Sequence, residues 1–327
     1  MKTHDEPASP TPTSSDSRQE KAALWATGLV IAAFYACLLH FGPQRGESAV
    51  WTWWSAWNKE SDFEHGWIFP VLLPGLLFWR RKEILAARGP GEWYGMALAI
   101  FGALTYLLAY RTIQWRIAII GLPFVLTGAA WYFWGRRAAW LLAFPFALIW
   151  LAIPVGFLQQ ATGGLQLIAT RLGHAGSSLC GVDTQIIGNR LILNNGAGFD
   201  VDEGCSGIRS LWALMLIAAA WTYVAKMAFW KKGVLFASVF PIAILGNAMR
   251  LISIFVLAKY GGEKFASTTW HDWSPLVFFY PFSLFILLLV QSVLEGGLPW
   301  KRATRKEIRR HIVTRPIDNP AADPHLP

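Results

Sequence analysis

Three residue types that can carry out acyl transfer stand far apart in this 327-residue chain, at Cys205, Arg250 and His271. A cysteine attacks a carbonyl carbon as the thiolate, and a helix N-terminus or a nearby cation lowers the pKa of a thiol. A histidine can take the thiol proton, and an arginine can stabilise the oxyanion that forms. These residues predict covalent catalysis by a cysteine, provided that the fold brings them together.

The cysteine lies in the sequence DEGCSGIRS, at the start of an apolar stretch. Gly204 and Gly207 have no Cβ, so backbone amides can approach a substrate carbonyl beside them. Arg209 stands one turn after the cysteine. It either supports the site or pairs with the acidic residues 202–203, and the sequence leaves both interpretations open.

Arg250 lies in the sequence PIAILGNAMRLISIFVLA, which is otherwise almost entirely apolar. An arginine inside a membrane helix costs on the order of 2.5–3.5 kcal/mol or more, so such a residue is a functional candidate by default. Asn247, one turn earlier on the same face, is a candidate for orienting it. The alternative is that Arg250 extends its side chain to the outer interface.

The elements that must position these residues are membrane helices. Hydrophobic residues make up 54% of the chain and charged residues only 15%. The apolar residues come in blocks near the thickness of a bilayer, which indicates an all-α multi-pass membrane protein. We expect about eight transmembrane helices, near residues 23–41, 66–79, 94–110, 117–134, 138–158, 206–225, 233–257 and 273–294.

The remaining segments are predicted tails and one outer segment. Residues 1–22 read as a disordered cytoplasmic tail, 23–294 as the membrane domain and 295–327 as a basic, Pro-rich cytoplasmic tail. Within residues 159–205, LQLIATRLGHAGSSL predicts an amphipathic helix on the outer leaflet. The following sequence alternates in polarity and contains Asn-Gly, which predicts a small β-hairpin before the sixth span.

Composition also bears on partners and cofactors. The chain has three cysteines, whose spacing fits no zinc site, and we predict neither a metal nor a cofactor. The net charge of +9 reflects basic loops of a membrane protein rather than a surface for nucleic acid. Tryptophans flank many apolar blocks, and those at Trp51, Trp53, Trp54 and Trp57 read as interfacial anchors.

The distribution of basic residues predicts the orientation. With a cytoplasmic N-terminus, the inner segments hold 19 Lys and Arg residues and the outer segments hold 8. This asymmetry places both termini in the cytoplasm. Cys205 then lies at the outer end of the sixth span and His271 at the outer mouth of the eighth. Arg250 lies 17 residues beyond Gly233, or about 25 Å along the seventh span, and so reaches the same depth.

Five sequence motifs resemble the exosortase/archaeosortase family of membrane transpeptidases. They are DFEHGWIFPVLLPGLLFWRRKEIL, FPFALIWLAIPVGFLQQATGGLQLIATRLG, EGCSGIRSL, PIAILGNAMRLISI and TTWHDWS, which occur in the order of the family within residues 60–290. The third is similar to the Cys-Ser-Gly box of the family, the fourth to its Asn-x-x-Arg box and the fifth to its late histidine.

The resemblance implies a cysteine peptidase and transpeptidase at the outer face of the bacterial cytoplasmic membrane. Its substrates would be exported proteins with a C-terminal sorting signal, which consists of a short motif, a transmembrane helix and a basic cluster. Cys205 matches the nucleophile, Arg250 the arginine of the family and His271 its third member. Ser206 belongs to the cysteine box, and His65 and Gly66 match the early motif.

We therefore expect Cys205 to form a thioester with the substrate, which an acceptor nucleophile of unknown identity, or water, resolves. Two alternatives remain open at this stage. One is a transporter or channel in which Arg250 is an anion site. The other is a membrane scaffold without catalytic activity, in which Cys180 and Cys205 form a disulfide.

Overall fold

The computed structural model describes residues 14–42, 45–59, 61–153, 163–188, 190–193 and 208–297, and most of these residues are helical. The first half of the chain contains α1 (Ser14–Ala32), η1 (Ala33–Cys37), α2 (Ala49–Lys59), η3 (Ser61–Ile68), α3 (Phe69–Trp79), α4 (Arg81–Ala86), α5 (Tyr94–Thr112), α6 (Trp115–Ala147) and η4 (Leu148–Ala152).

The second half contains α8 (Gly163–Leu179), β1 (Thr184–Ile187), β2 (Arg190–Leu193), α9 (Ile208–Val224), α10 (Phe229–Ala237), α11 (Val239–Tyr260), α12 (Glu263–Phe265), η6 (Ala266–Trp270), α13 (His271–Ser274), η7 (Pro275–Phe279) and α14 (Tyr280–Leu294).

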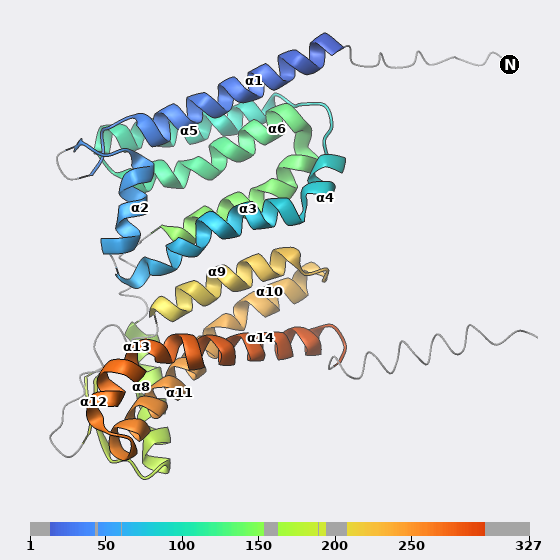
Figure 1. Ribbon diagram of the computed structural model, residues 1–327. Helices are drawn as coiled ribbons and strands as arrows, with labels where there is room; N and C mark the ends of the chain where they lie inside the picture. The colour runs from blue at the N-terminus through green and yellow to red at the C-terminus, as the bar shows by residue number, and fades with distance from the viewer. Residues whose placement is uncertain are drawn as a thin grey trace, which may run out of the picture.

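The long helices form a bundle with roughly parallel axes. Figure 1 shows that α1 begins and α14 ends at the same end of this bundle, whereas α2 and α13 lie at the opposite end. Among the described residues, five helical segments are long and apolar enough to cross a membrane: Gln19–Cys37, Tyr94–Thr112, Trp115–Ala152, Phe229–Tyr260 and Glu263–Leu294. Two shorter apolar helices, His65–Trp79 and Ser210–Val224, correspond to the second and sixth predicted spans.

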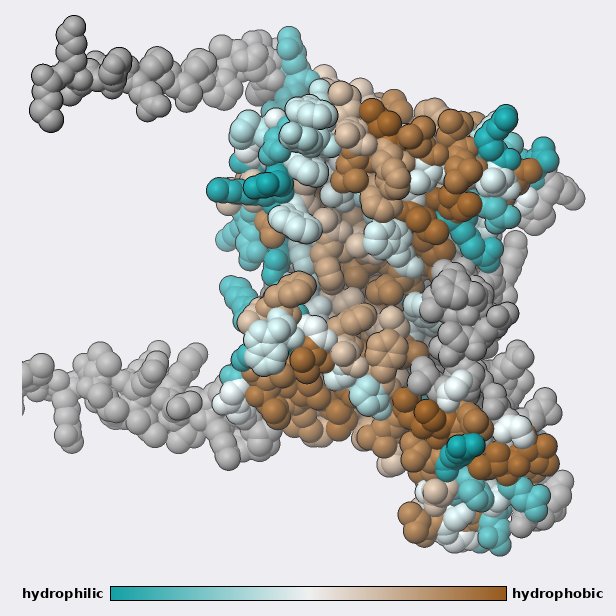
Figure 2. All heavy atoms as spheres, turned by 180° about the vertical axis from the view of Figure 1, so that it is seen from behind, coloured by the Kyte–Doolittle hydropathy of each residue, from teal (hydrophilic) through white to brown (hydrophobic). Residues whose placement is uncertain are grey.

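The surface has the pattern of a protein that crosses a bilayer. In Figure 2, apolar side chains cover the middle of the bundle, and hydrophilic side chains gather towards its two ends. Many large apolar side chains are exposed to the surroundings, such as Val71, Trp79 and Leu104. Because water would oppose so much apolar exposure, these helices belong in lipid, and the chain is an integral membrane protein.

The segment α6 contains a sharp turn that divides it into two arms. Gly135 has φ 77° and ψ 171°, which is outside the helical region and is open in practice only to glycine. The chain beyond the turn runs back along the first arm, since the Trp150 indole in η4 donates a hydrogen bond of 3.0 Å to the carbonyl of Ile120. The sequence-based boundary between the spans 117–134 and 138–158 therefore coincides with a real reversal of the chain.

Glycines bring α5 close to the first arm of α6. A Cβ on Gly95 would lie 2.2 Å from the backbone N of Tyr132, and one on Gly128 would lie 2.4 Å from the backbone N of Ala99. Small residues at membrane helix interfaces allow backbones to approach in this way, and the close approach increases the van der Waals contact that holds membrane helices together.

A helix and a hairpin precede α9, as expected. α8 packs along α11, where Gly173 and Gly176 leave space for Leu251 and Ile252. β1 and β2 pair antiparallel. Their connection is residues 188–189, and Gly188 has φ +63°. The turn is therefore not at the Asn-Gly pair, which lies outside the described residues.

Candidate active site

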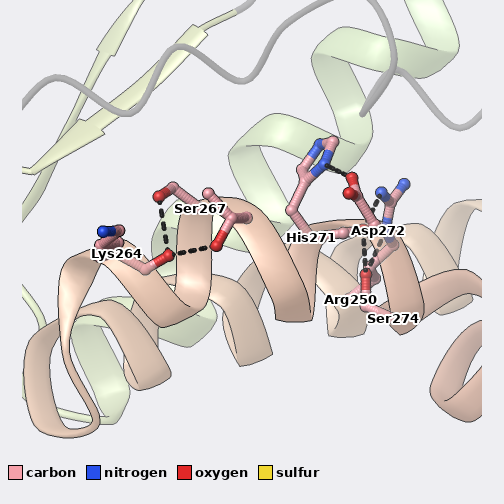
Figure 3. Close-up of polar contacts among 7 residues, drawn as sticks. Arg250, Lys264, Ser267, His271, Asp272 and Ser274 are labelled. Atoms are coloured by element: carbon pink, nitrogen blue, oxygen red, sulfur yellow. Dashed lines mark hydrogen bonds and ion pairs between the residues drawn. The ribbon is translucent and has the colours of Figure 1, made fainter.

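Arg250 is buried in the part of α11 that contacts the start of the last helical segment. Its side chain is 3% exposed, and that of Asn247 one turn earlier is 2% exposed. The Arg250 Nε donates to the hydroxyl of Ser274 at 2.8 Å, and its Nη2 donates to the backbone carbonyl of His271 at 3.2 Å. Arg250 therefore holds α13 against α11 through two hydrogen bonds (Figure 3).

The carbonyl that Arg250 contacts is available because of a proline. In an α-helix the carbonyl of residue i accepts from the N–H of residue i+4, which for His271 is Pro275, and proline has no N–H. The Ser274 hydroxyl donates to this carbonyl at 3.1 Å and accepts from Arg250. Pro275 thus leaves an acceptor that the arginine and the serine share.

Two π-helical turns flank this contact. The N–H of His271 bonds to the carbonyl of Ala266, and that of Tyr280 to the carbonyl of Pro275, each five residues back. Such turns are uncommon and occur frequently at functional sites. Each of these turns holds one residue more than an α-helical turn, one on either side of α13.

The imidazole of His271 lies beside a carboxylate. Its Nδ1 is 3.1 Å from Oδ1 of Asp272, whose side chain is 76% exposed. When Nδ1 carries the proton and donates it to Asp272, Nε2 is the basic nitrogen of the neutral ring. Figure 3 shows His271, Asp272 and the guanidinium group of Arg250 on the same side of α13.

The residues of the cysteine box fall outside the described part of the chain. Cys205, Gly204, Ser206 and Gly207 precede α9, and the side chain of Arg209 is likewise not described. α9 itself packs against α11, α14 and η3. Its first two turns contribute Leu211 and Leu214 to the buried cluster that contains Phe279 of η7. The cysteine thus stands three residues before a helix that packs beside the Arg250 and His271 elements.

The early motif lies beside the end of η4 and the tryptophans of α2. His65 is buried, and its Nε2 lies 3.0 Å from the carbonyl of Leu151, at the end of η4. A Cβ on Gly66 would lie 2.4 Å from Nε1 of Trp57. The indoles of Trp53 and Trp57 both donate to the carbonyl of Ala152, at 2.8 and 3.0 Å.

This cluster satisfies the last carbonyls of η4, which have no partner further along the helix. Trp53 and Trp57 are 6% and 2% exposed, so they are core residues rather than the interfacial anchors that we expected. The imidazole of His65 also lies parallel to the indole of Trp212 in α9, with ring centroids 6.2 Å apart. His65 therefore links η4 to α9.

Sequence reasoning missed Ser274 and the role of Pro275. The serine is fully buried, and its partner Arg250 is 24 residues away in the sequence, so only the proline gave a local signal. Cys180 is a free cysteine with an exposed side chain, and Cys205, its partner in the scaffold alternative, lies outside the described residues.

A membrane-embedded helical bundle with a buried arginine and a histidine at one end defines a class of integral membrane protein with a polar site near one surface. The model of the transmembrane exosortase family matches residues 53–289, which is well over half of the chain and includes every element of this site. The chain belongs to the transmembrane exosortase family, a family of membrane cysteine transpeptidases. No curated protein and no solved structure matches it.

Proposed function

We propose that this protein cleaves C-terminal sorting signals of exported proteins through a thioester at Cys205. Family membership supports the class of enzyme. The observation that best supports the site is the contact of Arg250 with Ser274 and with the backbone of His271. This contact joins two residues of the proposed mechanism that are 21 positions apart in the sequence.

The guanidinium group of Arg250 has donors left for a substrate. An arginine carries five N–H donors, and two of them are engaged by Ser274 and His271 within the described residues, which leaves three. The bonds to Ser274 and His271 fix the plane of the group. The remaining donors stabilise the negative oxygen of the tetrahedral intermediate, and fixed donors of this kind need no rearrangement during the reaction.

His271 transfers the proton. Its Nε2 accepts the proton of the Cys205 thiol, the thiolate bonds to the scissile carbonyl carbon, and the amine leaves with that proton after the C–N bond breaks. Asp272 keeps the ring in the tautomer that this requires. An amine or hydroxyl acceptor, or water, then attacks the thioester and restores the thiol.

The topology of the proposal has eight crossings. The two arms of α6 count as two, and α3 and α9 complete the set with the remaining long helices. Both chain ends lie in the cytoplasm, and the end of the bundle that carries α13 faces the exterior of the bacterial cytoplasmic membrane. The same-end arrangement of α1 and α14 supports this topology (Figure 1).

Processing of a reporter tests the proposal. The reporter carries a motif, a transmembrane helix and a basic cluster at its C-terminus, and a size shift reports its cleavage. We expect Cys205→Ser and His271→Ala to abolish cleavage at unchanged protein levels. Cys180→Ser is the matched control, because Cys180 is a free, exposed cysteine at the end of α8. Normal cleavage by Cys205→Ala would refute the mechanism.

Labelling of intact cells tests the orientation separately. An impermeant maleimide should modify Cys180 in cells and should modify a cysteine introduced at Lys82 only after the membrane is opened. The reverse pattern would contradict the proposed orientation and would leave the chemistry of the site untouched.

A further inference from the structure

A groove of about 650 Å³ runs between the two arms of α6, far from the site described above. Its walls are lined by Leu98, Pro123, Phe124, Thr127, Trp131, Ala139, Trp140, Ala143, Ala147 and Trp150, and Arg136 and Arg137 stand at one end. Its size falls in the range of about 300–1,000 Å³ that is usual for small-molecule sites.

The sequence explains why the arms do not close on each other. Ala139, Ala143 and Ala147 follow one another at intervals of four residues, so the second arm lines the groove with small methyl groups, beside the ring of Trp140. The rings of Phe124 and Trp150 lie at the end away from the turn, with centroids 5.4 Å apart. The result is an apolar groove that extends from these rings towards the two arginines beside the turn.

The end of the groove beside the turn is positively charged. Neither Arg136 nor Arg137 forms an ion pair with any residue in the described part of the chain. The nearby carboxylate of Glu92 accepts from the indole of Trp131 at 3.0 Å and from the backbone N–H of Arg136 at 3.3 Å. Arg88, also near this turn, stacks on the ring of Trp134 at 4.2 Å.

This charged end lies at the level of a membrane interface. Trp93, Tyr94 and Trp140 are exposed around the same turn, and such aromatic residues gather where hydrocarbon meets headgroups. From Arg136 to Ala147 the second arm rises about 16 Å. One leaflet contributes about half of the roughly 30 Å hydrocarbon thickness, so the groove has the length of one leaflet.

We propose that the groove binds one acyl chain of an anionic phospholipid, whose phosphate group contacts Arg136 and Arg137. The chain fills the space over the three alanines, and the two guanidinium groups donate to the phosphate oxygens. Basic pockets between membrane helices recognise anionic headgroups in this way. The lipid comes from the leaflet on the side where α1 begins and α14 ends.

The charge of the groove opposes other occupants. A membrane helix with a basic cluster at its end would bring positive charge to Arg136 and Arg137. A second copy of this chain packed symmetrically on the groove would bring its own Arg136 and Arg137 towards those of the first copy, and like charges would repel. A phospholipid with a negative headgroup is the occupant that matches both the apolar walls and the basic end.

Native mass spectrometry of the full-length protein in detergent tests this proposal. The protein is titrated with phosphatidylglycerol and with phosphatidylcholine of identical acyl chains, and with soluble glycerol 3-phosphate. The variants are Arg136→Gln with Arg137→Gln, and Ala143→Phe, which fills the groove. The control is Arg81→Gln with Lys82→Gln, which removes the same charge from the exposed surface of α4 at the same end of the bundle.

We expect the wild-type protein and the α4 control to retain phosphatidylglycerol about tenfold or more over phosphatidylcholine, since each basic residue near the surface favours anionic lipid. The double arginine variant should lose this preference, and Ala143→Phe should retain less of both lipids. Equal retention of phosphatidylglycerol by all variants would overturn the proposal. So would binding of glycerol 3-phosphate as strong as that of the lipid, or a dimer that Ala143→Phe dissociates.

Discussion

The hydroxyl of Ser274 is the part of the site whose removal gives the sharpest test of the structure. Ser274 is fully buried, accepts from the Arg250 Nε at 2.8 Å and donates to the carbonyl of His271 at 3.1 Å. Ser274→Ala leaves the buried Nε–H of Arg250 without this acceptor. A hydrogen bond to a charged group contributes about 1.5–3 kcal/mol, so the free energy of unfolding should fall by about 2 kcal/mol.

A second serine in the same helical segment provides the control. Ser283 is also fully buried, but its hydroxyl has no hydrogen-bond partner among the described residues. Ser283→Ala removes the same atom and should be neutral or slightly stabilising, because a buried hydroxyl without a partner is unfavourable.

Unfolding of both variants in mixed detergent micelles measures the difference. Ser274→Ala should also reduce reporter cleavage, because the guanidinium plane of Arg250 is no longer fixed. If the two alanine variants differ by less than about 0.5 kcal/mol in the free energy of unfolding, the assignment of Ser274 as an energetically important partner is wrong.

Three further outcomes can be tested in the same assays. Gly66→Ala should lower the melting temperature, since its Cβ would displace the indole of Trp57, whereas Gly75→Ala has open space and should not. Gly135→Ala should cost about 1–3 kcal/mol of stability, because alanine is strained at φ 77°; stability equal to that of Gly75→Ala would contradict this. Arg250→Lys should keep the charge and lose at least about tenfold in cleavage, since an ammonium group cannot replace the planar fork of donors. Full activity of this variant would refute the role of the fork.

The membrane helices could be predicted because hydropathy is a local property. The span boundaries at residues 134–138 followed from Gly135 and the two arginines after it, and the chain does reverse there. The common depth of Arg250 and His271 followed from counting residues along two helices. Their actual contact supports that count, although it runs through the backbone of His271 and not through its ring.

The missed features depend on partners that are distant in the sequence. The contact of His65 with the carbonyl of Leu151 joins residues 86 positions apart, and nothing near His65 indicates it. The burial of Trp53 and Trp57 was missed for the same reason, since a tryptophan near a span end looks the same whether it faces lipid or a neighbouring helix. The hairpin turn was misplaced because the sequence offers two turn signals, and the Gly-Asn pair at residues 188–189 is the one that connects the strands.

The π-helical turns on either side of α13 have a consequence for how this segment tolerates changes in length. A π turn is a helix that carries one extra residue, and each residue of an α-helix rotates the chain by about 100°. Because the turn between 275 and 279 already holds the extra residue, deletion of one residue there would leave an ordinary α-helical turn, and His271 would keep its direction relative to α14. The regular helix α11 has no such reserve, and the same deletion within it would turn Arg250 by about 100° relative to the helix beyond the deletion. The two π turns therefore let this end of the bundle lose a residue without separating its polar groups.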